Sequence, residues 1–374
     1  MARTLRSDKL LFWATLVLVG MSIVMVYSAS AVPAQQDFQN PGFYLAKQVM
    51  WAMLGLGLLV AAMRVDYHLF ETPSIIVGLL VVTVVALVAV FLFEARASTH
   101  RWMSVGGVSI QPSEFAKLVA IFFAAALLAR RMHRIDEPAY ALLPVGVVTM
   151  ALAGLIVKQP DYGTAAVLVL VVLTIVFAAG LSYRYLAAVA ALLLPAGFLL
   201  IWIEPYRWLR LVSFLDPWAD PQGAGYQVIQ SLTAIGSGGL LGRGLMAGVQ
   251  KIYYVPEAQS DFIYAVIGEE FGLLGTTLIL ACFAVIAWRG FRTSLVAPDR
   301  FGALLAVGLT MMVAAQAFFN ISVTLSLAPT KGIPLPFVSN GGSSLLVNLA
   351  AMGILLNISQ QASPAAAVAI EGRE

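Results

Sequence analysis

Residues 74–93 read SIIVGLLVVTVVALVAVFLF, a stretch of 20 residues in which no side chain is charged. A helix of about 20 residues is long enough to cross the roughly 30 Å hydrocarbon core of a bilayer. The stretch therefore predicts a transmembrane helix. Helices are also the spanning element that fits the rest of the chain, because backbone groups in lipid must pair within the segment and no alternating strand pattern is present.

Apolar runs of the same kind recur along the whole chain. They lie at about 10–30, 45–63, 74–93, 115–129, 139–157, 162–180, 185–203, 272–288, 301–328 and 343–360. The fourth run is short for a bilayer, so we expect it to include residues of the QPSEF segment before it. We predict an all-α, polytopic integral membrane protein with about ten transmembrane helices. A large extracytoplasmic loop, about 204–261, would separate helices 7 and 8.

The composition excludes several classes of protein. The 374 residues are 60% hydrophobic and 11% charged, and the mean hydropathy is +0.90. Soluble chains average about 45–50% apolar and roughly 25% charged residues. A soluble enzyme, a disordered chain and a nucleic-acid-binding protein are therefore excluded. The net charge of +3 says little about partners, because membrane proteins carry Lys and Arg in their loops.

Basic residues indicate the orientation in the membrane. An even number of spans places both termini on one side, and the basic residues of that side are Arg3, Arg6, Lys9, Arg64, Arg130, Arg131, Arg134, Arg184, Arg289, Arg292, Arg300 and Arg373. By the positive-inside rule this side is cytoplasmic. We expect a single transmembrane domain over residues 1–360, with both termini cytoplasmic and a disordered cytoplasmic tail at 361–374.

A second set of basic residues falls on the outer side, where the rule predicts few. The set comprises Arg96, Arg101, Lys158, Arg207, Arg210, Arg243, Lys251 and Lys331, with Lys47 and Lys117 near helix ends. This distribution favours an anionic ligand that is presented from the outer leaflet. The alternative for each residue is contact between a snorkelling side chain and lipid head groups.

The segment 251–270, KIYYVPEAQSDFIYAVIGEE, brings acids next to an apolar run. A helix starting after Pro256 would place Glu257 and Asp261 on one face. Asp261 lies at the edge of the apolar run, where burial would raise its pKa toward the range of a general base working near neutral pH. Glu270 lies deeper in the run, and we expect it to have a structural role, either pairing with Arg or Lys or capping a helix.

The first outer loop holds further candidates. His100, Arg101 and Trp102 precede a Gly-Gly turn, and residues 111–114 open the next span. Residues 112–114 are also good first-turn residues, and Trp102 is also a suitable interfacial anchor, so both have structural alternatives. No metal-ligand spacing, Gly-x-Ser-x-Gly elbow or Cys-His pair is present. The residues that remain as candidates for chemistry are the carboxylates and basic side chains at the outer boundary between membrane and water.

Five motifs carry a resemblance to a known family. In chain order they are HRWMSVGGVSIQPSEFAKL (100–118), KQPDYGTA (158–165), YQVIQSLTAIGSGGLLGRGL (226–245), VPEAQSDFIYAVIGEEFGLLG (255–275) and PTKGIPLPFVSNGGSSL (329–345). The chain resembles the SEDS (shape, elongation, division, sporulation) family over most of its length. MVYSAS (25–30), QKIYYVPEA (250–258) and PTKG (329–332) resemble the division-type FtsW branch more than the elongation-type RodA branch. Ser260 and Asn340 depart from the usual Thr and Tyr of the family.

The resemblance implies a peptidoglycan glycosyltransferase that polymerises lipid II at the outer face of the bacterial inner membrane. Its implied partners are a class B penicillin-binding protein, which supplies transpeptidation, other division proteins and membrane lipid, with no nucleic acid. In the implied inverting reaction, an acceptor hydroxyl attacks the donor sugar and undecaprenyl pyrophosphate leaves. By matching position, Asp261 is the catalytic base. The substrate-binding candidates are Arg101, Trp102, Glu114, Lys117, Arg243, Lys251, Glu257, Lys331, Ser343 and Ser344. A divalent cation (Mg2+ or Mn2+) would suit the pyrophosphate, but no ligand cluster in the sequence requires one.

Three alternatives stay open at this stage. An elongation polymerase of the RodA type would use the same chemistry in another process. A lipid II flippase would need charged residues around a midplane cavity, whereas the acids and bases of this sequence gather in the outer loops. A division scaffold would bind partners without making glycan.

Overall fold

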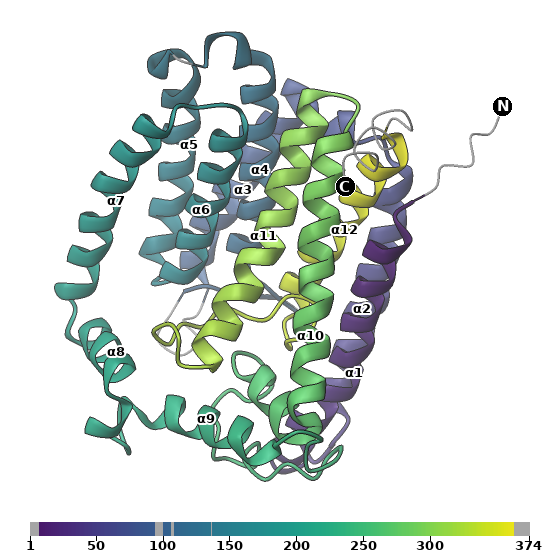
Figure 1. Ribbon diagram of the computed structural model, residues 1–374, viewed down its shortest axis with the longest axis vertical. Helices are drawn as coiled ribbons and strands as arrows, with labels where there is room; N and C mark the ends of the chain where they lie inside the picture. Colours follow the sequence, from purple (N-terminus) through teal and green to yellow (C-terminus); the bar gives the residue numbers. More distant parts are fainter. Residues whose placement is uncertain (1–6, 94–99, 106–107, 136, 363–374) are drawn as a thin grey trace.

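The computed structural model of the chain describes residues 7–93, 100–105, 108–135 and 137–362. Its elements in chain order are α1 (Lys9–Phe38), α2 (Phe43–Arg64), η1 (Tyr67–Glu71), α3 (Pro73–Ala89), η2 (Val90–Leu92), β1 (Met103–Val105), β2 (Val108–Ile110), α4 (Pro112–Arg131), η3 (Met132–Arg134), α5 (Pro138–Lys158), α6 (Tyr162–Ala178), α7 (Tyr183–Trp202), α8 (Pro205–Leu215), η4 (Pro217–Ala219), α9 (Tyr226–Gly238), α10 (Ile263–Val296), α11 (Arg300–Thr324) and α12 (Gly342–Gln361). Figure 1 shows most of these helices running side by side as a bundle.

The prediction of an all-α, polytopic membrane protein is confirmed. Each of the ten apolar runs in the sequence coincides with a helix. Within the described residues, eight helices are long and apolar enough to cross a membrane, and α6 and α7 contain shorter apolar helices. That all ten cross the bilayer stays a prediction. As expected, α4 begins at Pro112 and so includes the PSEF residues.

The centre of the bundle is formed by α4, α11 and α12. Within their most apolar windows, 72%, 72% and 83% of the residues are buried inside the protein. The corresponding share of α3 is only 22%, so α3 has a large surface left for lipid. A helix surrounded by other helices can carry polar groups, because they find partners away from lipid. The polar residues of α4 and α11 described below lie in this centre.

Two contacts define one end of the bundle, and two short helices mark the other. At one end, the backbone N–H of Asp8 donates to Ser359 Oγ at 3.4 Å, so α1 begins where α12 finishes. His68 Nε2 lies 3.2 Å from Asp299 Oδ2 at the same end, which joins the α2–α3 connection to the start of α11. The opposite end carries α8 and α9 (Figure 1). The even number of helices predicted from sequence agrees with this arrangement.

The segment 204–261, predicted to be an outer loop and here called the outer segment, differs from a plain loop. The region 204–261 contains α8 and α9, and the first outer loop contains an antiparallel hairpin, in which Met103 pairs with Ile110. Neither the strands nor these helices were predicted from the sequence. The strands have only three residues each, too short for a recognisable alternating pattern.

The helix predicted after Pro256 is wrong. Glu257 has φ +51°, a left-handed conformation that interrupts a helix, and α10 begins only at Ile263. The physical reason lies in the backbone carbonyls of residues 259–261, which accept hydrogen bonds from other elements. These tertiary bonds replace the bonds that a continuing helix would have needed.

α10 is broken at Gly272, which has φ +62°. A Cβ at this position would come within 2.4 Å of the Gly242 backbone nitrogen, so only glycine fits. Backbone groups around the break pair with the outer segment: the N–H of Arg243 donates to Glu269 O at 2.9 Å, and that of Leu273 donates to Gly239 O at 2.9 Å. The segment 239–244 is therefore docked on the broken helix through its main chain.

Candidate functional site

Asp261 is held in place through its main chain. Its backbone carbonyl accepts a hydrogen bond from Asn320 Nδ2 of α11 at 2.8 Å, and the same amide also donates to Ile333 O at 2.8 Å. One residue earlier, the carbonyl of Ser260 accepts from Ser339 Oγ at 2.5 Å. These bonds fix the backbone at residue 261 and leave its carboxylate available for chemistry.

The surroundings of Asp261 suit a general base. Its side chain is half-buried at the junction between the outer segment and α10. The pKa of Asp261 is raised to about 7, first by desolvation through burial and second by the negative charge of Glu257. Arg101 and Arg210 oppose the rise, and Asp161 adds to it. A carboxylate with a pKa near the working pH is efficient at accepting a proton.

Arg101 and Asp161 reach the site from different elements. Arg101 Nε donates to Gln159 O at 3.2 Å, and the guanidinium also bonds to Pro160 O, so the hairpin is attached to the start of α6. Asp161 is buried and caps α6, accepting from the Thr164 N–H at 3.3 Å. Hydrogen bonds from Gln111 and Ser113 complete its shell. The KQPDYGTA motif thus forms one wall beside Asp261.

The loop 325–341 forms a second wall. A Cβ at Gly332 would lie 3.0 Å from Asp261 Oδ2, so the loop backbone passes directly against the carboxylate. Lys331 is half-buried, and desolvation lowers the pKa of its ammonium group. Among the residues that the structure describes, no ion pair or hydrogen bond involves this ammonium group. An ammonium group without a protein partner among the described residues, on the residue next to Gly332, is suited to an anionic ligand.

A buried polar group connects α4 to α11. Lys117 Nζ donates to Glu114 Oε1 at 2.9 Å and to Gln316 Oε1 at 2.8 Å, and both charged side chains are at most 2% exposed. Glu114 Oε2 is buried and has no hydrogen-bond partner in the described part of the chain. Gln316 lies one helical turn from Asn320, which holds Asp261. The pair therefore lies behind the site, inside the bundle.

The predicted serines are structural links. Ser343 Oγ accepts the N–H of Gln111 at 3.0 Å and so connects α12 to the residue before α4. Ser344 Oγ accepts from Asn348 Nδ2 at 3.1 Å within α12. Both serines are buried. Trp102 is half-buried and directly follows Arg101. Their proposed contacts with substrate stay predictions.

Arg243 and Lys251 lie in a second cluster, around the break in α10. Lys251 Nζ donates to Glu270 Oε1 at 2.5 Å and to Ser28 Oγ at 2.7 Å, and both charged side chains are buried. Glu269, also fully buried, lies 3.6 Å from Arg243 Nη1. The structural pairing expected for Glu270 is thus present. Within the described chain, no hydrogen bond or ion pair joins the side chains of this cluster to Asp261. The substrate contacts predicted for Arg243 and Lys251 therefore stay predictions.

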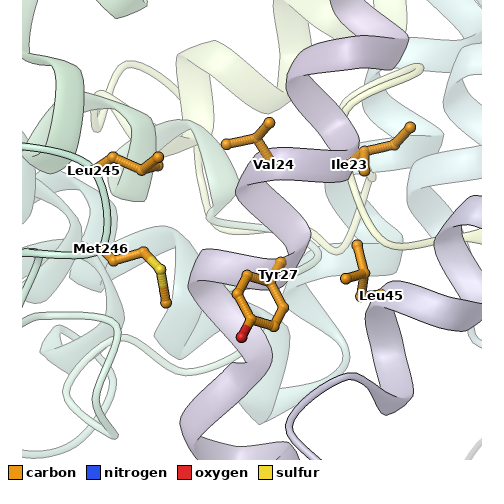
Figure 2. A pocket seen from close by; sticks show the side chains of 6 residues that line it. All are labelled: Ile23, Val24, Tyr27, Leu45, Leu245 and Met246. Atoms are coloured by element: carbon orange, nitrogen blue, oxygen red, sulfur yellow. The ribbon is translucent and has the colours of Figure 1, made fainter.

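An apolar pocket of about 240 Å³ lies between α1, α2 and the outer segment (Figure 2). Figure 2 shows Val24 and Tyr27 of α1 on the side of Leu245 and Met246, with Ile23 on the side of Leu45. The pocket presents almost no polar surface and shares no residue with the Asp261 site. It is therefore unsuited to an anionic sugar substrate.

Two contributors to the site were not predicted from the sequence. Arg210 was counted as an outer basic residue but not as a site residue, although it acts on Asp261. Asp161 lies in the KQPDYGTA motif, and that motif was the available signal. No group of three or more His, Cys, Asp or Glu side chains is placed to hold a metal among the described residues. The divalent cation considered above stays a prediction.

The pH dependence of activity follows from these charges. If Asp261 is the base, kcat/KM falls as the pH drops below about 7, because the carboxylate is then protonated. Glu257→Gln removes a negative neighbour that raises this pKa, so the acid limb of the profile moves to lower pH. Asp37→Asn, an exposed carboxylate on α1, serves as the control and leaves the limb in place. If the acid limb of Glu257→Gln lies at the same pH as that of the parent, the result contradicts the assignment of Asp261 as the base.

Comparisons with known proteins identify the family. The profile of the family described as cell cycle protein (FTSW_RODA_SPOVE) matches residues 9–364. The probable peptidoglycan glycosyltransferase FtsW of Geobacter sulfurreducens is 40% identical, covering 95% of both chains. Stage V sporulation protein E of Bacillus subtilis is 42% identical, covering 94% of this chain and 97% of the relative.

Solved structures give the same result. A chain of the structure described as "Structural coordination of polymerization and crosslinking by a peptidoglycan synthase complex" matches with a TM-score of 0.77 and 28% identity, covering 95% of this chain and 98% of that one. The rod shape determining protein RodA of Thermus thermophilus matches with a TM-score of 0.69 and 26% identity, covering 96% and 98%. Because both sequence and fold agree over nearly the full length, the chain belongs to the SEDS family, which groups FtsW, RodA and SpoVE.

Proposed function

We propose that this protein is a peptidoglycan glycosyltransferase that polymerises lipid II at the outer face of the bacterial inner membrane. The observation that carries the proposal is Asp261, a fixed and partly desolvated carboxylate at one end of a membrane bundle, with Arg101 and Arg210 close enough to act on its charge. The names of the FtsW relatives support the same activity.

Asp261 acts as the general base. Its carboxylate takes the proton of the acceptor sugar hydroxyl while the oxygen attacks the anomeric carbon of the donor N-acetylmuramic acid. The new glycosidic C–O bond forms as the bond to the pyrophosphate oxygen breaks, so the α-linkage becomes β in one displacement. With a pKa of about 7, the carboxylate is basic enough to take the proton in the transition state and is still largely unprotonated once the pH rises above 7.

The leaving group needs positive charge. Undecaprenyl pyrophosphate departs as an anion, and fixed cations stabilise it more effectively in a partly desolvated site than in water. Lys331 supplies an ammonium group without a protein partner in the described structure, next to the Gly332 backbone that touches Asp261. Arg101 and Arg210 add guanidinium groups from the hairpin and from α8.

The membrane placement extends the same proposal. The multi-pass bundle has one end rich in short basic connections, and the positive-inside rule assigns that end to the cytoplasm together with both termini. The Asp261 end then faces outward, where the sugar head group of the lipid-linked substrate is displayed.

The process and the partners are inferred from the relatives. Their names favour division or sporulation over elongation. The structural match to a peptidoglycan synthase complex supports a class B penicillin-binding protein as partner, since polymerisation and crosslinking are coupled in that complex. We propose a division polymerase that works with such a transpeptidase and with other division proteins.

The proposed activity is tested directly with substrate. Purified full-length protein, with and without its cognate penicillin-binding protein, is incubated with lipid II, and the products are separated on a gel. We expect a ladder of glycan strands. Partner binding without any glycan would instead indicate a scaffold, and movement of lipid II across vesicles without polymerisation would indicate a flippase.

A further inference from the structure

α8 has an unusual distribution of side chains. Trp208, Leu209, Val212 and Leu215 are apolar, fall on one face of the helix, and are 38% to 74% exposed. In a helix that borders water, the exposed face would be polar. Here the face that points away from the protein is the apolar one.

The inward face of α8 carries the charges. Arg207 Nη2 donates to the Tyr162 hydroxyl at 2.5 Å, and its guanidinium lies 4.0 Å from the centre of that ring. Arg210 Nη1 donates to Thr330 O at 3.4 Å. Tyr162 and Thr330 belong to the two walls of the Asp261 site. The helix thus turns both arginines toward the site and its apolar side chains outward.

The surroundings of α8 indicate what covers its apolar face. α8 follows α7 after two residues, and Trp208 packs edge-to-face against Phe198 of α7 with ring centres 6.3 Å apart. Figure 1 shows α8 beside the end of α7, at the same end of the bundle as α9. Exposed Trp202 and Trp218 flank the helix on either side. Tryptophans gather where the lipid head groups meet the hydrocarbon core, which is the level of a transmembrane helix end.

We propose that α8 is a membrane-interface helix whose apolar face is embedded in the outer lipid layer, and that this anchoring holds Arg207 and Arg210 toward the Asp261 site. The occupant of the exposed face is the bilayer itself. Apolar burial on one side and basic side chains on the other are typical of helices that lie in the plane of the interface. The coupling to catalysis rests on the proposed function, whereas the lipid contact does not.

The coupling has a specific electrostatic consequence. Four charged groups act on Asp261: Glu257 and Asp161 raise its pKa, and Arg101 and Arg210 lower it. If α8 lifts away from the membrane, Arg210 moves away from Asp261, and the pKa of the carboxylate rises. A loss of anchoring therefore shifts the acid limb of the activity profile to higher pH, in the same direction as Arg210→Gln.

The lipid contact is tested by quenching. The single cysteine, Cys282, is replaced by Ser, and a fluorescent label is placed on Leu209→Cys or, as control, on Gln222→Cys, an exposed polar position beyond η4. The full chain is reconstituted in phosphatidylethanolamine and phosphatidylglycerol vesicles. We expect quenchers attached high on the acyl chains to affect the label at 209 strongly, and aqueous iodide to affect the label at 222. Equal iodide quenching at both positions would overturn the proposal, whether or not the protein makes glycan.

The coupling is tested with a charge on the apolar face. Leu215→Asp should slow polymerisation at least about tenfold and raise the pKa of the acid limb, because misplaced catalytic groups lose rate steeply. Leu241→Asp, an equally exposed apolar position in the same outer region, is the matched control and should change neither quantity. If Leu215→Asp misfolds, the milder Leu215→Gln is measured in its place. A folded variant with the parent's rate and acid limb would overturn the coupling.

Discussion

Asp261→Asn should abolish glycan synthesis while leaving the protein folded. The substitution removes the proton acceptor but keeps the size of the side chain. The loss of a positioned general base typically costs about 10²- to 10⁴-fold in rate. The fold should survive, since the bonds that hold this position come from the backbone carbonyls of residues 260 and 261, which the substitution leaves intact.

The measurement is single-turnover polymerisation of lipid II by the purified variant, together with its melting temperature in detergent. Asp37→Asn makes the same chemical change at an exposed position near the end of α1 and should keep the parent's rate. An Asp261→Asn variant that polymerises within a few-fold of the parent would place the base elsewhere. Glu257 would then be the next candidate, because it is the neighbouring carboxylate that acts most strongly on Asp261.

Lys251→Met should destabilise the protein by about 3–5 kcal/mol, because it leaves the fully buried Glu270 carboxylate without its cation. The double variant Lys251→Met/Glu270→Gln should recover most of the loss, since neither charge then remains buried. Lys158→Met, an exposed lysine at the end of α5, is the control and should change stability by less than about 0.5 kcal/mol.

The same experiment separates the two roles considered for Lys251. Unfolding is followed by thermal denaturation, and lipid II binding is measured below the transition. A destabilised variant that binds lipid II normally supports the structural ion pair with Glu270. A variant as stable as the parent that fails to bind lipid II would favour the substrate contact predicted from sequence.

The fold was predictable because membrane insertion is a local property of sequence. A run such as 74–93 contains all the information needed to recognise a spanning helix, and the helices appear where the apolar runs lie. The position of Asp261 just before α10 was predictable for a similar reason, since it directly precedes an apolar run, whereas its role as the base stays a prediction. The pairing of Glu270 followed from the cost of burying an isolated charge.

The composition of the site depends on contacts between distant segments. Asp161 and Arg210 are each tens of residues away from Asp261 in sequence, and the packing of α6 and α8 brings them together. The failed helix after Pro256 has the same origin. Glu257 and Asp261 have helical spacing, but Asn320, Ser339 and the N–H of Asn340 take the carbonyls that a helix would use. Ser260 and Asn340, the two departures from the family pattern, both take part in these hydrogen bonds between residues 259–261 and the loop 325–341.

The break at Gly272 also bears on how the chain is made. A helix entering lipid with unpaired backbone groups resists insertion, because each such group costs several kcal/mol in hydrocarbon. The segment 239–244, which pairs with the backbone around the break, precedes α10 in the chain and is synthesised first. Its carbonyls and N–H groups are therefore already present when residues 269–274 emerge from the ribosome. α10 can enter the bilayer as a broken helix because the chain supplies the missing partners in the right temporal order.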